Sequence, residues 1–123
     1  VGFLPEPMTL KELALKVKLK LEAPFITLWQ AAKSPETVVK KVAVCGGSGG
    51  DLIKKAEQKA DVFITSDLKY HSIIACSIPM IDAGHFFTES PILPALQRYL
   101  LPLGTEIEIF KKSSADILDL VMF

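Results

Sequence analysis

The sequence predicts a single α/β domain over residues 1–123, in which parallel strands alternate with helices. Three apolar runs of strand length, residues 42–45, 61–65 and 79–83, are separated by segments with helical spacing of their apolar residues. Strand, helix and strand in succession form right-handed crossover units, which build a layered α/β sheet. The chain is long enough for one hydrophobic core, and 50% of its residues are hydrophobic, which excludes intrinsic disorder.

The first predicted element is a helix. Residues 2–5 indicate a loop already under way, and because the chain begins with Val1 we expect it to be a piece of a longer protein. The segment Thr9-Leu-Lys-Glu12 is a capping box, in which the Thr9 hydroxyl accepts a bond from a first-turn amide and Glu12 reaches back. Apolar residues at helical spacing then predict a helix over residues 9–21.

The middle of the chain holds the regular part of the pattern. Residues 25–29 are apolar and β-prone and predict a strand, and residues 31–37 predict a loop or short turn. The continuous apolar run over 42–45 is typical of a strand that is covered on both faces. The glycine loop of residues 46–50 follows, and a helix is predicted over about residues 52–60.

Two further strands and two helices complete the predicted layer. Between the strands at 61–65 and 79–83, Asp67 is expected to cap a short helix over residues 70–75. A longer helix is predicted to begin at residue 88 or 91 and to end at 101. The last predicted strands lie at residues 105–110 and 116–123.

Charge and composition limit the classes of partner and compartment. Lys+Arg and Asp+Glu are 14 each, which argues against nucleic acid or an anionic membrane as the main partner. Residues 1–41 hold seven Lys and four Glu, a basic balance that indicates a solvated helix face or, as the alternative, a binding patch. No apolar run reaches the ~18 residues of a membrane span. Cys45 and Cys76 lie in apolar runs, which indicates buried, inert thiols in a reducing compartment, and we expect a cytoplasmic protein.

Candidate functional residues gather where the predicted strands end. In open α/β sheets, ligands bind beyond the carboxyl ends of the strands. Three of these ends, residues 45–51, 65–67 and 82–85, are rich in Gly, Asp, Ser and His. We therefore expect the functional site at this edge of the sheet.

The glycine loop over residues 46–50 has two interpretations. Consecutive backbone amides before a helix can bind a phosphate. However, Asp51 follows where a phosphate loop has lysine, and Leu52 stands where the dinucleotide motif has its third glycine. The favoured interpretation is a tight turn where the backbone passes close to another segment.

His85 and Glu89 are the candidate metal ligands. Their four-residue offset places both on one face of a helical turn, although such a spacing also arises by chance. Catalytic zinc usually has three protein ligands, and Asp82, Asp67 and His71 are the candidates for further ligands. A histidine on a short helix is more often a packed or capping residue, which is the alternative for His71.

Four motifs together resemble the NIF-three-like family, whose bacterial members are often called GTP cyclohydrolase I type 2 homologues. They are residues 2–10, 42–51, 61–71 and 81–89, in this order. The resemblance covers only the C-terminal half of such proteins. It implies a layered α/β fold, with a mixed sheet flanked by helices, whose two halves face a cleft that holds two metal ions.

The resemblance also implies roles for individual residues. In the family motif, the histidine ligates a metal and the glutamate bridges both metals, and these roles fall on His85 and Glu89. The remaining ligands are a His-His pair and an aspartate of the N-terminal half, so the centre is expected to be incomplete in this chain. Ser66 stands where the family usually has glycine.

The function expected from this resemblance is dinuclear metal binding in a metal-dependent hydrolase of unknown substrate. Two divalent ions per subunit are expected, as Zn, Fe, Mn or Ni, because imidazole and carboxylate ligands suit all four. Asp67 and His71 are expected to orient a ligand or transfer protons. The family also implies a homo-oligomer, commonly a hexameric ring. The alternative is a non-catalytic protein-interaction or regulatory module, with this chain an incomplete fragment.

Overall fold

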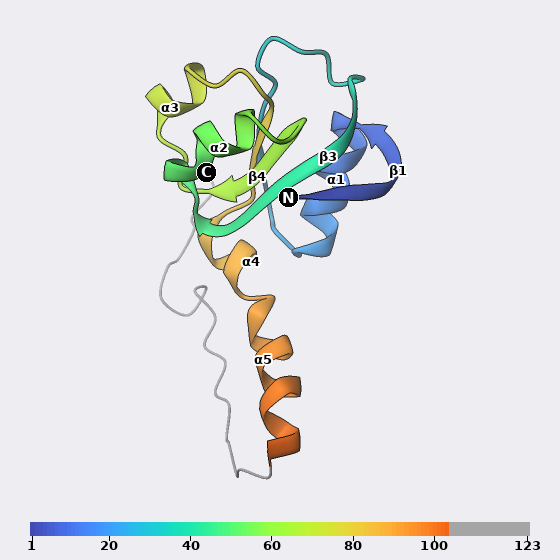
Figure 1. Cartoon of the computed structure of the whole chain (residues 1–123), viewed down its shortest axis with the longest axis vertical. Coiled ribbons are helices and arrows are strands. Elements are labelled where there is room, and N and C mark those ends of the chain that lie inside the picture. Colours follow the sequence, from blue (N-terminus) through green and yellow to red (C-terminus); the bar gives the residue numbers. More distant parts are fainter. Residues whose placement is uncertain (104–123) are drawn as a thin grey trace. The chain divides into compact units, whose positions relative to one another are not determined.

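The computed structural model describes residues 1–103 (Figure 1). Contacts divide the chain into a compact unit over Val1–Glu89 and a second unit that begins at Ser90. The strands expected at 105–110 and 116–123 lie outside the described residues, so a single domain over the whole chain stays a prediction. No helix within residues 1–103 has the length and apolar character needed to cross a membrane. The elements are β1 (Gly2–Thr9), α1 (Leu10–Lys20), β2 (Thr27–Trp29), β3 (Val38–Ser48), the 3-10 turn η1 (Gly50–Leu52), α2 (Ile53–Glu57), β4 (Val62–Ser66), α3 (Tyr70–Ile74), β5 (Met80–Asp82), α4 (His85–Glu89), α5 (Ile92–Leu100) and the 3-10 turn η2 (Leu101–Leu103).

The strands form one mixed sheet in the order β1-β3-β4-β5-β2. The three central strands are parallel, as predicted, with β4 paired to both β3 and β5. The edge strands β1 and β2 run antiparallel to their neighbours. The α/β fold with a mixed sheet and flanking helices is therefore confirmed.

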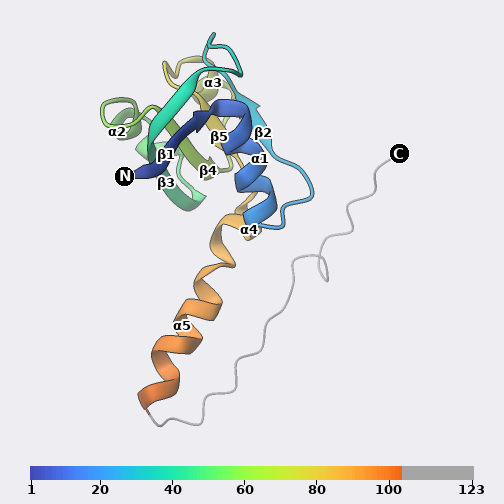
Figure 2. The same cartoon turned by 90° about the vertical axis from the view of Figure 1, so that its right-hand side faces the viewer.

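Helices cover both faces of the sheet, and a separate core cluster fills each face (Figures 1 and 2). One face packs against α1, and the other packs against α2 and the segment that includes α3. All five residues of β4 are buried, because this central strand is covered on both sides. The α1-side cluster consists of Leu10, Leu13, Ala14, Val39, Val42, Val62, Ile64, Ile81 and Ala83, and the opposite cluster of Ala43, Ile53, Ala56, Phe63, Cys76, Ile78 and Met80.

The loop predicted at residues 2–5 is wrong, because this segment is part of the edge strand β1. Proline cannot donate to a strand ladder, and Pro5 and Pro7 therefore argue against a strand when the sequence is read locally. In the structure the register shifts between Phe3 and Met8, so both prolines lie in an irregular stretch of an edge strand.

Other boundaries also differ from those predicted. β3 continues through residues 46–48, so the first half of the glycine loop belongs to a strand. Val44 is 66% exposed, so the end of β3 is not covered on both faces. The helix expected at 52–60 is shorter. The longer helix is confirmed with its start at residue 91, since Pro91 and Leu101 are the caps of α5, but the short helix α4 before it was not predicted.

The capping box at the start of α1 is confirmed. The Glu12 amide donates to Thr9 Oγ1 at 3.2 Å, and the Thr9 amide donates to Glu12 Oε2 at 2.7 Å. The bonds from Thr9 hold the pKa of Glu12 below its usual value, because they stabilise the charged carboxylate. This cap fixes where β1 ends and the helix that covers the sheet begins.

Asp61 fastens the start of β4 to β3. Its Oδ2 accepts bonds from the amides of Lys40 at 2.9 Å and Lys41 at 2.8 Å, and its own amide donates to the Lys41 carbonyl at 2.8 Å. These backbone bonds hold the pKa of Asp61 below its usual value. The charged carboxylate is therefore the form that stabilises the fold.

We predict that Asp61→Ala lowers the free energy of unfolding by about 1–2 kcal/mol at neutral pH, because two amides lose a charged acceptor. A depressed pKa contributes stability above the unfolded value of about 3.9, and this contribution is lost as the pH falls through the folded value. Urea unfolding at several pH values should therefore show the difference between the two proteins shrinking in acid. Asp51→Ala, at an exposed position, is the control, and a similar loss there would contradict the assignment.

Gly49 is a position where the packing beside the sheet requires a residue without a side chain. A Cβ built at this buried glycine meets Thr65 Oγ1, and lies 3.1 Å from both Cys45 Cβ and Phe63 Cζ. A Cβ on the neighbouring Gly50 meets no atom within 4 Å. A substitution at Gly50 is therefore a matched control for the same substitution at Gly49.

We predict that Gly49→Ala lowers the free energy of unfolding by about 1–3 kcal/mol, because the methyl group overpacks the core beside β4. Gly50→Ala should leave it unchanged or raise it slightly, since it removes unfolded-state freedom without a clash. Thermal melts of both variants measure this, and equal melting temperatures would show that the loop tolerates side chains at both positions.

Candidate metal centre

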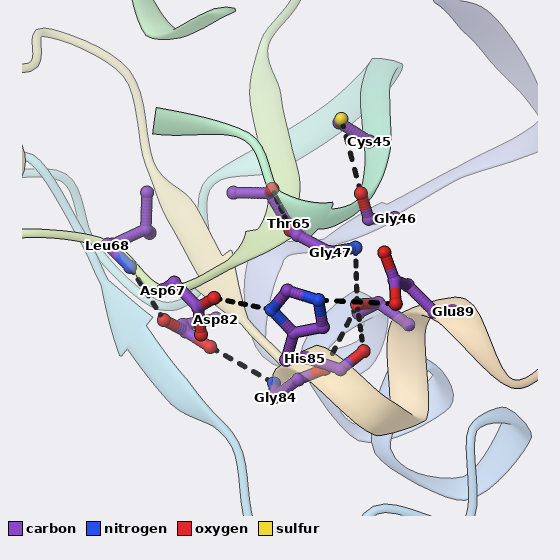
Figure 3. A network of polar contacts seen from close by, with 11 residues as sticks. Cys45, Gly46, Gly47, Thr65, Asp67, Leu68, Asp82, Gly84, His85 and Glu89 are labelled. Atoms are coloured by element: carbon purple, nitrogen blue, oxygen red, sulfur yellow. Dashed lines mark hydrogen bonds and ion pairs between the residues drawn. The ribbon is translucent and has the colours of Figure 1, made fainter. Parts of the chain in front are cut away.

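The carboxyl ends of the three parallel strands meet at one edge of the sheet, as predicted. β3 ends there in its glycines, β4 leads to Asp67, and β5 ends at Asp82. α4 begins after the short turn of Ala83 and Gly84 that follows β5, and it contacts both β3 and β4. Figure 3 shows the polar side chains that this arrangement brings together.

His85 lies between two carboxylates. Its Nδ1 bonds Asp67 Oδ2 at 2.5 Å, and its Nε2 lies 3.2 Å from Glu89 Oε2 (Figure 3). About half of each side chain is exposed, so the group is open to solvent. The predicted placement of His85 and Glu89 on one helical face is confirmed by their positions on α4.

The contact with Asp67 orients the imidazole and keeps a proton on its Nδ1. A carboxylate accepts hydrogen bonds only, so the Nδ1–H of His85 donates to Asp67. This bond, followed by the charge of Glu89, raises the pKa of His85 above its ordinary value. In the neutral ring the free lone pair is then on Nε2, on the side of Glu89.

Asp67 does not cap α3, contrary to the prediction. The N-cap of this helix is Lys69, which makes no capping bond with its side chain. Asp67 instead has a left-handed backbone conformation, with φ +55°, and its carboxylate is held by His85. The turn that follows β4 therefore holds Asp67 against His85 and does not cap α3.

Asp82 ties together the turns that carry Asp67 and His85. Its Oδ2 accepts a bond from the Leu68 amide at 3.2 Å, and its Oδ1 accepts one from the Gly84 amide at 3.0 Å. Each of these two amides is next in sequence to Asp67 or His85. Asp82, considered above as a further ligand, thus positions both partners of the hydrogen bond between Asp67 and His85.

Glu89 is placed by the close approach of β3 to α4. Gly47 has φ +64°, and a Cβ at this position would overlap the Glu89 carboxylate. The Gly47 amide donates to Thr88 Oγ1 at 2.9 Å, and the Gly47 carbonyl accepts from Thr65 Oγ1 at 3.0 Å. A Cβ on Gly46 would lie 2.9 Å from the Thr88 carbonyl oxygen. The interpretation of the glycine loop as a close backbone approach is therefore correct.

Thr65 and Thr88 are the residues of the site that the sequence did not single out. Both hydroxyls satisfy backbone groups of Gly47 or of the turn before α4. The glycine loop itself is the sequence signal that could have pointed to them. Its buried backbone amides and carbonyls lack strand partners, so nearby hydroxyls are needed to bind them.

His71 is not brought to this cluster by the contacts described for residues 1–103. It is exposed on α3 and packs edge-on against Tyr70, with ring centroids 5.8 Å apart.

Cys76 is buried, as predicted, and burial raises the pKa of its thiol. Cys45 is only half-buried, because the end of β3 is partly uncovered, so the prediction of burial is wrong for this cysteine. Ser66 is fully buried, and its hydroxyl has no partner among the described residues.

The available donors fit part of a metal site. Within residues 1–103, no group of three or more His, Cys, Asp or Glu side chains is arranged to hold a metal ion. His85 and Glu89 present one imidazole nitrogen and one carboxylate, which suit divalent transition metals. A metal-binding histidine usually donates its other N–H to an oxygen, as His85 does to Asp67.

Comparison with known proteins gives relatives over most of the chain. The "GTP cyclohydrolase 1 type 2 homolog" of Campylobacter jejuni is 34% identical over 114 residues, which cover 89% of this chain and 45% of that protein. The protein of the same name from Bacillus subtilis is 42% identical over 90 residues, or 70% of this chain and 23% of that protein. The chain thus spans less than half the length of these relatives.

Solved structures and a family model agree with these relatives. A Bacillus cereus protein related to NIF3 matches with a TM-score of 0.71 at 28% identity, over 86% of this chain and 30% of that one. Staphylococcus aureus SA1388, at 24% identity, shares the fold with a TM-score of 0.77, over 97% of this chain and 41% of that one. The model of the family Duf34/NIF3 (NGG1p interacting factor 3) matches residues 1–116. With a match over nearly the whole sequence, the chain belongs to the Duf34/NIF3 family.

Proposed function

We propose that this chain contributes His85 and Glu89 to a dinuclear metal centre in a metal-dependent hydrolase. The observation that carries the proposal is the imidazole geometry, in which Asp67 takes Nδ1 and leaves Nε2 beside the Glu89 carboxylate. Two ligands on one helical turn, oriented by contacts to two strand ends, are arranged as a binding site requires.

The residues of the chain would have distinct roles in such a centre. His85 would ligate through Nε2 while Asp67 holds the proton on Nδ1. Glu89, whose second oxygen lies against Gly47, would bridge two ions and fix their separation. Two divalent ions would supply an activated water and stabilise negative charge on a substrate oxygen.

The class of reaction is proposed from the names of the relatives. Those proteins are called GTP cyclohydrolase 1 type 2 homologs, which indicates a hydrolase. The chain spans less than half of their length, so the remaining ligands are proposed to come from the part that it does not match. Zn, Fe, Mn and Ni all suit the two ligands of this chain. The hexameric ring and the cytoplasmic location stay predictions.

We predict that the 123-residue chain by itself binds Zn²⁺ or Mn²⁺ weakly, because it offers two ligands instead of a full set. Calorimetric titration should show one low-affinity site, and dialysis should remove the ion. His85→Ala and Glu89→Gln should abolish the binding, whereas Glu6→Gln, at an exposed position on β1, should leave it unchanged. Two tightly held ions per chain would contradict the incomplete site.

In a protein that joins this chain to the remaining half found in its relatives, we predict two ions per subunit and hydrolytic activity. Glu89→Gln should then lose at least one ion per subunit, and the activity with it, because the bridging charge is gone. Its melting temperature in chelator should change little, since Glu89 is the last residue of α4, where the helix dipole disfavours a carboxylate by only about 0.3–1 kcal/mol.

Elemental analysis and assays with nucleotides and phosphoesters check these outcomes. Full metal occupancy in Glu89→Gln would refute the bridging role. Two bound ions without turnover of any substrate would favour the interaction module over the hydrolase.

A further inference from the structure

The outer side of α1 carries large apolar side chains that no other element of residues 1–103 covers. Leu10, Leu13 and Ala14 of this helix are buried against the sheet. Leu15 and Leu19, one turn apart, are 53% and 76% exposed. Figure 2 shows α1 along one side of the Val1–Glu89 unit. Phe25, which follows the helix, is also 56% exposed.

Two hollows of about 530 Å³ each adjoin Leu15 and form a shallow surface that we call the α1 groove. One hollow follows the helix, and the other lies between the helix and the segments before and after β2. The first hollow is lined by Glu12, Leu15, Lys16, Leu19 and Lys20, and the second by Lys11, Ala14, Leu15, Lys18, Phe25, Ile26, Leu28, Gln30, Pro35 and Glu36.

The charged residues of the α1 groove are mostly basic. Four lysines and two glutamates line it, which leaves a balance of +2. The Glu12 carboxylate is bound to the Thr9 amide and hydroxyl, at 2.7 and 2.9 Å, so it is occupied by the helix cap. The lysines are Lys11, Lys16, Lys18 and Lys20.

We propose that the α1 groove is a docking surface for an acidic amphipathic helix of a partner protein. Apolar side chains one turn apart on such a helix would fill the hollows beside Leu15, and its carboxylates would meet the lysines. A lipid surface fits less well, because it would leave the hollows unfilled and place Glu12 and Glu36 against anionic headgroups. This docking surface is independent of the metal centre, because neither His85 nor Glu89 lines it.

The probe is a labelled synthetic helix of about 18 residues, with leucines at positions i, i+3, i+4 and i+7 and glutamates on both flanks. Two control peptides have lysine in place of every glutamate, or the same composition in an order without helical spacing. Fluorescence anisotropy measures binding to the full chain. We expect the acidic helix to bind, and its affinity to fall as salt rises, because the lysines are exposed.

Two double variants test the surface itself. Leu15→Ser with Leu19→Ser, and Lys16→Glu with Lys20→Glu, should each weaken binding at least about tenfold, a change of about 1.4 kcal/mol. Lys55→Glu with Lys59→Glu, in and after α2 on the other face, is the control and should bind like the original chain. Circular dichroism verifies that all variants are folded, as expected for exposed positions.

Three results would overturn the proposal. The first is equal binding of all peptides, or unchanged binding of both groove variants. The second is that the chain binds phosphatidylserine vesicles but not the acidic helix, and that the Leu15→Ser, Leu19→Ser variant loses the vesicle binding. The third is self-association in analytical ultracentrifugation that the leucine variant abolishes, which would assign the surface to a second copy of the chain.

Discussion

The position of the proposed bridging glutamate depends on how closely the β3 backbone approaches α4. Gly47 can lie against Glu89 only because it has no side chain and has a positive φ. Its amide and carbonyl are bound by hydroxyls of α4 and β4, so the approach costs no unsatisfied backbone group. The glycine-rich end of β3 therefore shapes the site without supplying a ligand.

The three carboxylates near His85 have different surroundings and different roles. Asp82 accepts backbone amides on both sides and is part of the scaffold. Asp67 is half exposed and meets the imidazole, and Glu89 faces the other ring nitrogen. A ring whose Nδ1–H donates to Asp67 has little freedom to rotate, so its Nε2 direction is set before any ligand arrives. This preorganisation comes from turns that the sheet brings together.

The sequence predicted what depends on neighbouring residues and missed what depends on distant ones. The central strands were found because a strand buried on both faces is a continuous apolar run. The spacing of His85 and Glu89 was readable because one helical turn sets it. β1 was missed because its prolines oppose a strand locally, and only pairing with β3 overrides them. Asp67 was a candidate, but its partner was hidden because their contact requires β4 and β5 to end side by side.

The two edges of the sheet have a consequence for how the chain behaves at high concentration. An exposed strand edge can recruit an extended segment of another molecule, which is a route to strand exchange and aggregation. Pro5 and Pro7 remove two donors from β1, and its register shift disrupts the flat ladder that an incoming strand would need. At the opposite edge β2 has only three residues. The compact unit therefore resists fibrous growth at both edges of its sheet.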